Sequence, residues 1–272
     1  FCHHECRAGK CKLILSHTVA YKHLPGIQIP SQHVPNIAAG FIRTLLFVAL
    51  TRPYPGSWVS CPRTIPLTPI MAESVSQALL VVDMQNDFLL PSSPVCVAGG
   101  MDAVPAVMQA VQFARENGVP VIWVLRAHHH LGVDVEISRK GHFSDGAGVC
   151  VYGTPGASLV AGLQADPQEI VIHKQRFSGF MCTELDLVLR RLGVTRVTIC
   201  GVQTPNCIRA TAFDAVALGY AQVEVLSDAT ASASKAVQAA NLYDLRQVGV
   251  STPSLEEWAS GIVAQVAAHS AI

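Results

Sequence analysis

The sequence of 272 residues predicts an α/β domain in which a parallel sheet carries helices on both faces. Continuous apolar runs, of which residues 78–82 are the first, are typical of strands buried on both sides of a parallel sheet. Between these runs stand segments whose apolar residues recur at helical spacing. Strands and helices that alternate in this way form right-handed crossovers, so the predicted domain has three layers.

The elements follow from this pattern in chain order. The predicted strands are residues 78–82, 119–125, 169–173, 196–200 and 222–226. The predicted helices are residues 102–117, 157–163, 184–192, 210–216, 235–247 and 254–268. Gly118 and Gly193 are expected to end the first and third helices, and Thr183 to cap the third. Residues 126–156 follow no regular pattern, and a loop of this length is expected to line a site.

The composition changes near residue 70. Residues 1–70 contain one acidic residue, Glu5, against seven Lys or Arg, together with many prolines, which is not a core-forming pattern. We therefore expect residues 1–70 to be a disordered N-terminal extension, either a transit-like segment or sequence upstream of a start at Met71. Residues 71–272 are expected to be the folded domain.

Charge and cysteine usage exclude several classes of function. The chain has 19 Lys and Arg against 19 Asp and Glu and no basic stripe, so we expect no nucleic-acid partner. The longest apolar block, residues 37–50, is too short for a bilayer and contains Arg43, so we expect no membrane partner. Nine cysteines without paired C-x-x-C spacing favour reduced thiols and a cytoplasmic location. Organelle import stays open if residues 1–70 are a transit peptide.

One cysteine stands where a nucleophile would be built. Cys207 follows the apolar run 196–200 and a tight turn, in the first turn of the predicted helix. We expect Thr204 to be the N-cap and Pro205 the first helical residue. The free N–H groups and the helix dipole at such a position favour a thiolate. The alternative is that Cys207 is a small buried hydrophobic residue.

Two further reactive side chains end predicted strands. Asp83 and Lys174 each lie at or just after the end of an apolar run, as Cys207 does. Because the functional crevice of an open α/β sheet lies at the carboxyl ends of its strands, the three residues are expected on one rim. Lys174 would stabilise the thiolate and Asp83 would transfer its proton. Taken singly, Asp83 is also typical of a turn and Lys174 of a solvated loop.

These residues belong to three motifs that occur in a characteristic order. The motifs are Val81–Phe88, Lys174–Phe180 and Gly201–Cys207, the last followed by Thr211–Ala215. Together they resemble the isochorismatase-like cysteine hydrolase superfamily, and the chain looks most like its plant nicotinamidase-like members. The resemblance extends from about residue 78 to residue 258.

The resemblance implies a six-stranded Rossmann-like sheet and a catalytic triad of Asp83, Lys174 and Cys207. It also implies a cis peptide bond between Val202 and Gln203. The backbone N–H groups of Gln203 and Cys207 would then form the oxyanion hole. Members of the superfamily are often homo-oligomers, so a homo-oligomer is expected here.

Departures from the relatives bear on the metal and the substrate. A cysteine at position 207 favours cleavage of a C–N bond through a thioester, because true isochorismatases lack it. Metal-dependent nicotinamidases have an Asp where this chain has Ala127, although His129 matches one of their ligand positions. We therefore expect no metal and no other cofactor.

Four residues are predicted to line the substrate pocket. Phe88 and Phe177 would supply apolar walls, and Asn206 beside the nucleophile would tune selectivity, while His129 would face the same pocket. For the two phenylalanines the alternative is ordinary hydrophobic packing.

Two hypotheses for function remain. The first is an amidohydrolase that acts on a small-molecule amide, ureido compound or lactam through an acyl-thioenzyme. The second is a catalytically silent binding or scaffold protein that keeps the fold. The complete set of Asp83, Lys174 and Cys207 favours the enzyme, whereas Ala127 keeps the second hypothesis open.

Overall fold

The computed structural model describes residues 4–7, 10–13, 76–144, 146 and 148–270. The chain divides into two compact units, Phe1–Pro66 and Leu67–Ile272. In the first unit, strands β1 (His4–Arg7) and β2 (Lys10–Leu13) form an antiparallel pair. Most of the predicted N-terminal extension, including the apolar block 37–50, lies outside the described residues.

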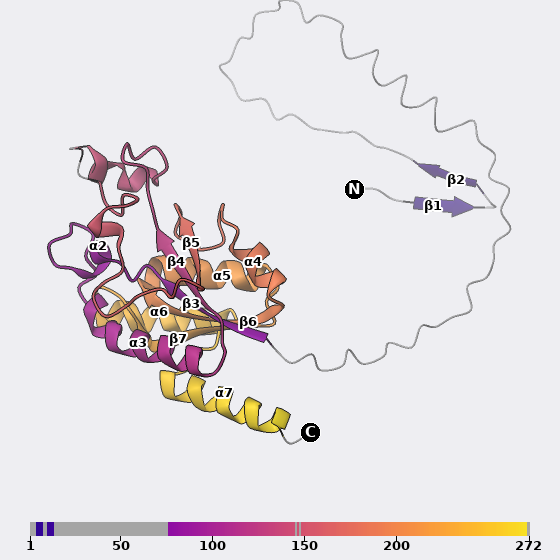
Figure 1. The fold of residues 1–272 in the computed structure, drawn as a ribbon. Coiled ribbons are helices and arrows are strands. Elements are labelled where there is room, and N and C mark those ends of the chain that lie inside the picture. The colour runs from indigo at the N-terminus through magenta and orange to yellow at the C-terminus, as the bar shows by residue number, and fades with distance from the viewer. Residues whose placement is uncertain (1–3, 8–9, 14–75, 145, 147, 271–272) are drawn as a thin grey trace, which may run out of the picture. The chain divides into compact units, whose positions relative to one another are not determined.

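The second unit is built on a parallel sheet (Figure 1). Its five strands have the order β5-β4-β3-β6-β7, and every neighbouring pair is parallel. The strands are β3 (Ser76–Val82), β4 (Val121–Arg126), β5 (Ile170–Lys174), β6 (Val194–Val202) and β7 (Gln222–Ala231). The α/β prediction is confirmed. The sixth strand implied by the resemblance is not among the described residues, and the five apolar runs correspond to the five strands.

The direction of the chain reverses at β3, and this reversal creates the place for a site. From β3 the chain adds β4 and then β5 on one side, and it returns to add β6 and β7 on the other. The carboxyl ends of β3 and β6 therefore lie at a topological switch point, where loops leave the sheet in opposite directions and open a crevice.

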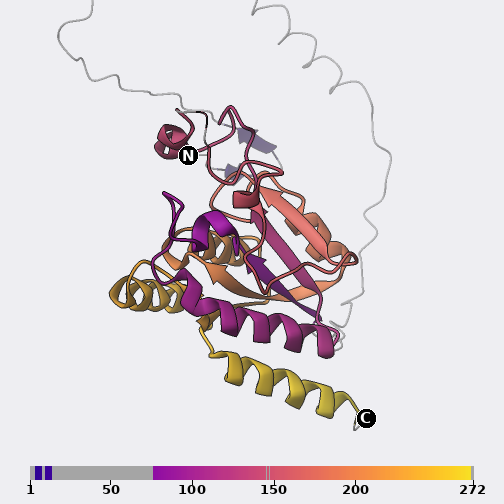
Figure 2. The same ribbon diagram turned by 60° about the vertical axis from the view of Figure 1, so that its left-hand side comes forward.

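Helices cover both faces of this sheet (Figures 1 and 2). One face carries α3 (Gly100–Glu116) and α7 (Leu255–Ser270). The other carries α4 (Leu185–Arg191), α5 (Arg209–Ala217) and α6 (Lys235–Gln247). Among the helices that the structure describes, none has the length and apolar character needed to cross a membrane.

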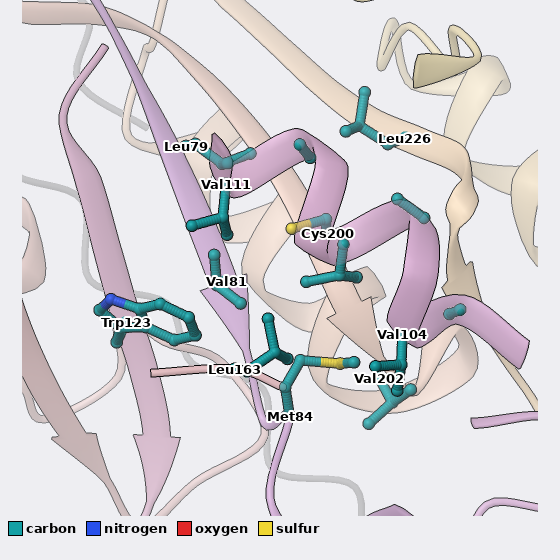
Figure 3. Packing of buried hydrophobic residues seen from close by; sticks show 14 of the residues in the cluster. Leu79, Val81, Met84, Val104, Val111, Trp123, Leu163, Cys200, Val202 and Leu226 are labelled. Carbon is teal, nitrogen blue, oxygen red and sulfur yellow. The ribbon is translucent and has the colours of Figure 1, made fainter. Parts of the chain in front are cut away.

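Side chains that alternate along β3 supply both layers of the core. Leu79 and Val81 pack towards α3, where Val104 and Val111 meet them (Figure 3). Leu80 and its neighbours on the opposite face pack against α4, α5 and α6. Because both faces are covered, β3 is apolar at every position from Ala78 to Val82, and these residues form a continuous apolar run in the sequence.

One predicted helix is wrong. Residues 157–163 do not form a helix, and only a short 3₁₀ turn, η2 (Pro155–Ala157), occurs there. The following backbone pairs instead with the segment after β3, because Asn86 N donates to Ser158 O and Val160 N donates to Met84 O. The segment opposite contains the short helix α2 (Asn86–Leu89).

Candidate functional site

The three residues expected on one rim all lie at the carboxyl edge of the sheet. Asp83 follows β3, Lys174 ends β5, and Cys207 follows β6. All three are buried, with exposed fractions of 1%, 0% and 2%. Lys174 Nζ lies 2.7 Å from Asp83 Oδ2, and both residues influence the pKa of Cys207. The structure therefore brings a carboxylate, an ammonium and a thiol together at the switch point.

The backbone at Asp83 turns its carboxyl group into the site. Asp83 has a φ of +52°, a left-handed conformation that Asp adopts more readily than most residues. Its N–H donates to Val124 O of the adjacent strand at 3.0 Å. Oδ2 accepts from Lys174, whereas Oδ1 is buried and has no hydrogen-bond partner among the described residues. One carboxylate oxygen thus remains available as a proton acceptor.

The turn that carries Cys207 differs from the predicted helix start. The Val202–Gln203 peptide bond is cis, as the resemblance implied, but Thr204–Ile208 form a single π-helical turn, η3, before α5 begins. Thr204 is not the N-cap. Its hydroxyl lies 2.6 Å from Gln238 Oε1 in α6 and 3.1 Å from Ala231 O. The side chain therefore ties the turn to neighbouring elements.

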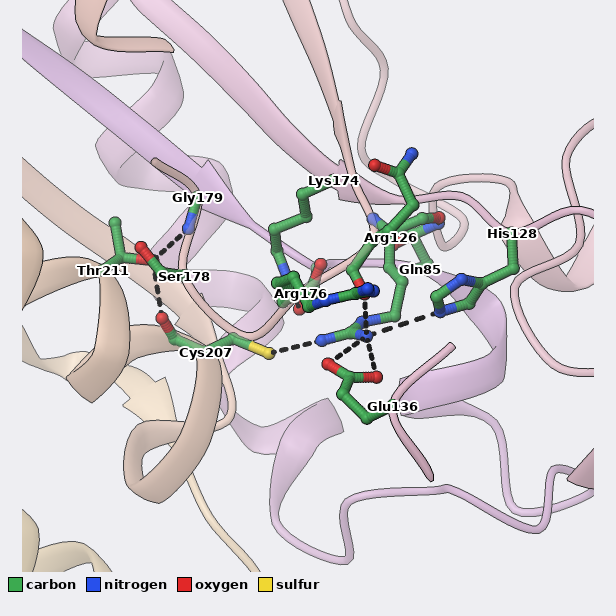
Figure 4. Close-up of polar contacts among 12 residues, drawn as sticks. Gln85, Arg126, His128, Glu136, Lys174, Arg176, Ser178, Gly179, Cys207 and Thr211 are labelled. Atoms are coloured by element: carbon green, nitrogen blue, oxygen red, sulfur yellow. Dashed lines mark hydrogen bonds and ion pairs between the residues drawn. The ribbon is translucent and has the colours of Figure 1, made fainter. Parts of the chain in front are cut away.

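A second contact fixes the position of Cys207. The Thr211 hydroxyl donates to Cys207 O at 2.6 Å and accepts from Gly179 N at 2.9 Å (Figure 4). These two bonds connect the turn to the loop after β5, which also carries Phe177. The Thr211 hydroxyl thus links the Cys207 turn to the loop that follows Lys174.

The resting state of the thiol also differs from the sequence-based expectation. Burial raises the pKa of Cys207, and the negative charge of Asp83 raises it further, whereas Lys174 and Arg126 lower it. The net effect is an increase, because complete burial outweighs the two nearby cations. The sequence could not reveal this burial, and a thiol in this setting requires a base to become nucleophilic.

Arg126 is a site residue that the sequence-based prediction did not include. It ends β4 and is completely buried. Its Nη1 lies 3.0 Å from both carboxylate oxygens of Glu136, and its Nη2 lies 3.7 Å from Cys207 Sγ (Figure 4). Arg126 ends a strand at the same edge of the sheet as Lys174. Lys174 was selected as a reactive side chain at the end of a predicted strand, and the same criterion would also have selected Arg126.

The charge of Arg126 is well supported. Burial acts to lower its pKa, but Cys207 when it is ionised as a thiolate, and the carboxylates of Asp83 and Glu136, raise the pKa of Arg126 above its usual value. For Glu136, burial acts to raise the pKa, but Arg126 reverses this effect and the net pKa is lowered. The pair is therefore an ion pair held in the interior.

The four residues predicted to line the pocket have different surroundings. Phe88 is buried in the core below α3, while Phe177 is partly buried against the opposite core. Asn206 is partly buried and lines a surface groove that also contains Phe177. His129 is exposed, with its ring 4.2 Å from that of His130, so it is not gathered with the other three.

Gln203 and Cys207, whose N–H groups were predicted to form the oxyanion hole, both lie in the turn after β6. Gln203 directly precedes η3 and Cys207 is its fourth residue. Their assignment to an oxyanion hole remains a prediction.

The donor set around Ala127 does not fit a divalent metal ion. His128, not His129, points into the protein, and its Nε2 lies 3.4 Å from Arg126 Nη1 (Figure 4). Its other nitrogen lies 3.3 Å from Asp134. Within the described ranges, no three His, Cys, Asp or Glu side chains converge as ligands. A guanidinium cation beside the buried His128 disfavours a second positive charge.

Comparisons with known proteins agree with this architecture. The isochorismatase domain model matches residues 77–257. An Arabidopsis thaliana protein described as a "probable inactive nicotinamidase" is 48% identical over 66% of this chain and 93% of its own. The ureidoacrylate amidohydrolase RutB of Azorhizobium caulinodans is 30% identical over 65% of this chain and 86% of its own.

A solved structure extends the similarity to three dimensions. The isochorismatase family protein from Desulfovibrio vulgaris is 45% identical and superposes with a TM-score of 0.67, covering 69% of this chain and 98% of its own. The family model covers more than half of the chain, and the strand order places the matched motifs at one edge. The chain therefore belongs to the isochorismatase family.

Proposed function

We propose that the protein is a cysteine-dependent hydrolase that cleaves the C–N bond of a small amide. The observation that carries this proposal is the buried ion pair between Lys174 and Asp83 beside the Cys207 thiol. An ion pair without access to water is costly to maintain for stability alone, whereas it suits proton transfer to and from a neighbouring nucleophile.

The proposed reaction begins at the free oxygen of Asp83. Oδ1 accepts the thiol proton, and Sγ of Cys207 forms a bond to the carbonyl carbon of the amide. The N–H groups of Gln203 and Cys207 hold the resulting oxyanion. When the C–N bond breaks, Asp83 returns the proton to the leaving nitrogen, so ammonia or an amine departs and a thioester remains.

Hydrolysis of the thioester completes the cycle. Asp83 takes a proton from water, the hydroxyl adds to the carbonyl carbon, and the C–S bond breaks as Cys207 recovers its proton. Lys174 holds the Asp83 carboxyl group in place through the 2.7 Å contact with Oδ2 and lowers the pKa of Cys207. Because the pKa of Cys207 is raised at rest, the thiol cannot attack the amide until its proton has passed to Asp83.

A second candidate function is binding without turnover. The observation that favours it is the name of the Arabidopsis thaliana relative, which describes that protein as inactive. In this case the fold would hold a small molecule or a partner near Cys207 without forming a thioester.

The test is ammonia release from a panel of small primary amides and ureido compounds. Cys207→Ala should lower the rate by about 10⁴-fold or more, because the nucleophile is lost. Cys182→Ala is the matched control, since Cys182 is an exposed thiol. Release that survives in Cys207→Ala would refute covalent catalysis, and no release with any member of the panel would favour the binding protein.

A further inference from the structure

One edge of the Arg126 guanidinium faces the site without an oxygen partner. Nη1 is occupied by Glu136 and by Gln175 O, at 3.0 Å and 3.3 Å. Nε is buried and has no partner among the described residues, and Nη2 has only the sulfur of Cys207 at 3.7 Å. Nε and Nη2 lie on the same side of the planar group and together match the two oxygens of a carboxylate.

A second guanidinium approaches the same region. The Arg139 Cζ lies 5.2 Å from the centre of the Phe177 ring, and the Arg126 Cζ lies 5.3 Å from it. Nη1 of Arg139 is buried and has no hydrogen-bond partner in the described part of the chain. Arg139 also lies 5.8 Å from the centre of the Phe88 ring, so both predicted pocket phenylalanines meet a cation.

The charges of this region do not cancel. Lys174 is paired with Asp83 and Arg126 with Glu136. Arg139 forms no ion pair with any described carboxylate, although its charge reaches Glu136 and contributes to the lowered pKa of that carboxyl. Arg126 and Arg139 therefore share the single carboxylate of Glu136, which leaves an excess of positive charge. A neutral ligand would leave this charge and the free donors of Arg126 without partners, whereas an anionic ligand would satisfy both.

We infer that the substrate is an amide that also carries a carboxylate, which binds the Nε–Nη2 edge of Arg126 with Arg139 nearby. The inference rests on the proposed function, because it places the amide carbonyl at Cys207. Nη2 is only 3.7 Å from the attacking sulfur, so the carboxylate must stand a few bonds from the scissile carbonyl carbon. The expected class is a short amide acid such as malonamate or succinamate.

Matched substrate pairs test this inference. The ratio kcat/KM for malonamate should exceed that for neutral malonamide by about 100-fold or more, and succinamate and succinamide should differ in the same direction. Arg126→Lys keeps the positive charge but loses the two parallel N–H donors, so it should reduce the preference for the carboxylate substrate by about 10-fold or more. Arg139→Gln, in the 3₁₀ helix η1 (Ile137–Phe143), should also reduce this preference. Arg246→Gln removes an exposed arginine of α6 and should leave it unchanged.

Alkylation of the Cys207 thiol tests the anion site without any need for amide turnover. Iodoacetate and iodoacetamide alkylate thiols by forming an S–C bond and releasing iodide, and only the first is an anion. The ratio of iodoacetate to iodoacetamide rates should be at least about 10-fold higher at Cys207 than at exposed Cys182, and Arg139→Gln should lower it. If neither reagent reaches the thiol, calorimetry of malonate binding to the Cys207→Ala protein tests the anion site instead. Weaker malonate binding after Arg139→Gln is added to that protein supports the inference.

The outcomes separate the inference from the proposed function. Turnover of neutral amides at equal or higher rates, with no preference for iodoacetate and no binding of malonate, would overturn the anion site and leave the amidohydrolase intact. Malonate binding that depends on Arg139, without hydrolysis of any amide, would keep the anion site and refute the amidohydrolase.

Discussion

The pairing of Asp83 with Lys174 determines what the thiol can do. Each residue alone is compatible with an ordinary structural role, and the sequence could not distinguish these roles because it does not reveal burial. In the structure both side chains are excluded from water, and among the described residues Asp83 is the one acidic side chain within 4.0 Å of Lys174 Nζ. The two side chains consequently hold each other in place beside Cys207.

Asp83→Asn tests this pair. It keeps the size of the side chain but removes the proton acceptor, so kcat for amide hydrolysis should fall by about 10³-fold or more. It also leaves the buried ammonium of Lys174 without a counter-charge, so the free energy of unfolding should fall by about 3–5 kcal/mol. Urea denaturation measures the second effect.

An exposed ion pair provides the control for stability. Asp244 pairs with Arg209 at 3.0 Å, with side chains that are 54% and 37% exposed. Asp244→Asn should lower the unfolding free energy by less than about 1 kcal/mol. Equal losses for the two variants would show that Asp83 and Lys174 are not isolated from water as described.

Glu136 gives a prediction for pH dependence. Its pKa is lowered from 4.5 in the folded protein, so the folded state binds fewer protons than the unfolded state as pH falls. The stabilisation is present above the unfolded pKa and is lost as pH falls through the folded pKa. Glu136→Gln should therefore flatten the loss of unfolding free energy between about pH 6 and pH 3. An unchanged slope would contradict the ion pair with Arg126.

At the scale of elements, the close approach of β3 and β6 holds the site together. Val82 and Gly201 are paired residues of these two strands, and they directly precede Asp83 and the Cys207 turn. Gly201 has a φ of +111°, and a Cβ at this position would overlap Val82 O. A side chain is therefore excluded both by the backbone conformation and by the neighbouring strand.

Gly201→Ala should lower the unfolding free energy by more than about 3 kcal/mol and reduce catalysis, because β6 must move away from β3. Gly249→Ala is the matched control, since Gly249 also has a positive φ, +85°, but no atom within 4 Å of an added Cβ. The control should cost only about 1–2 kcal/mol, measured by urea denaturation. Similar losses in the two variants would show that contact with Val82 is unimportant.

The elements were predictable where a single physical pattern dominates. Each of the five strands contains a short apolar run, and in β3 and β4 that run is buried on both faces, so the sequence alone located the strands. Thr204 and residues 157–163 were misassigned for one reason: their backbone or side-chain partners lie in distant segments. Thr204 bonds to α6 and β7, and the segment after Pro155 pairs with residues that follow β3.

At the scale of the whole molecule, the strand order explains why three motifs far apart in sequence form one site. The sequence predicted the common rim because carboxyl ends of parallel strands share an edge. It did not predict Arg126, because only Ala127 and the histidines were considered at the end of β4, and Arg126, the last residue of that strand, was not. It also did not predict the raised pKa of Cys207, which depends on packing from all layers.

The central claim is that Cys207 forms a thioester with the substrate, and capture of this intermediate tests it most directly. Substrate amide is mixed with the protein, quenched in acid and analysed by mass spectrometry of the peptide that contains Cys207, with hydroxylamine added in a parallel reaction. We expect an acyl adduct on Cys207 and formation of a hydroxamate, both lost in Cys207→Ala. Amide hydrolysis that proceeds without an adduct and persists in Cys207→Ala would contradict it.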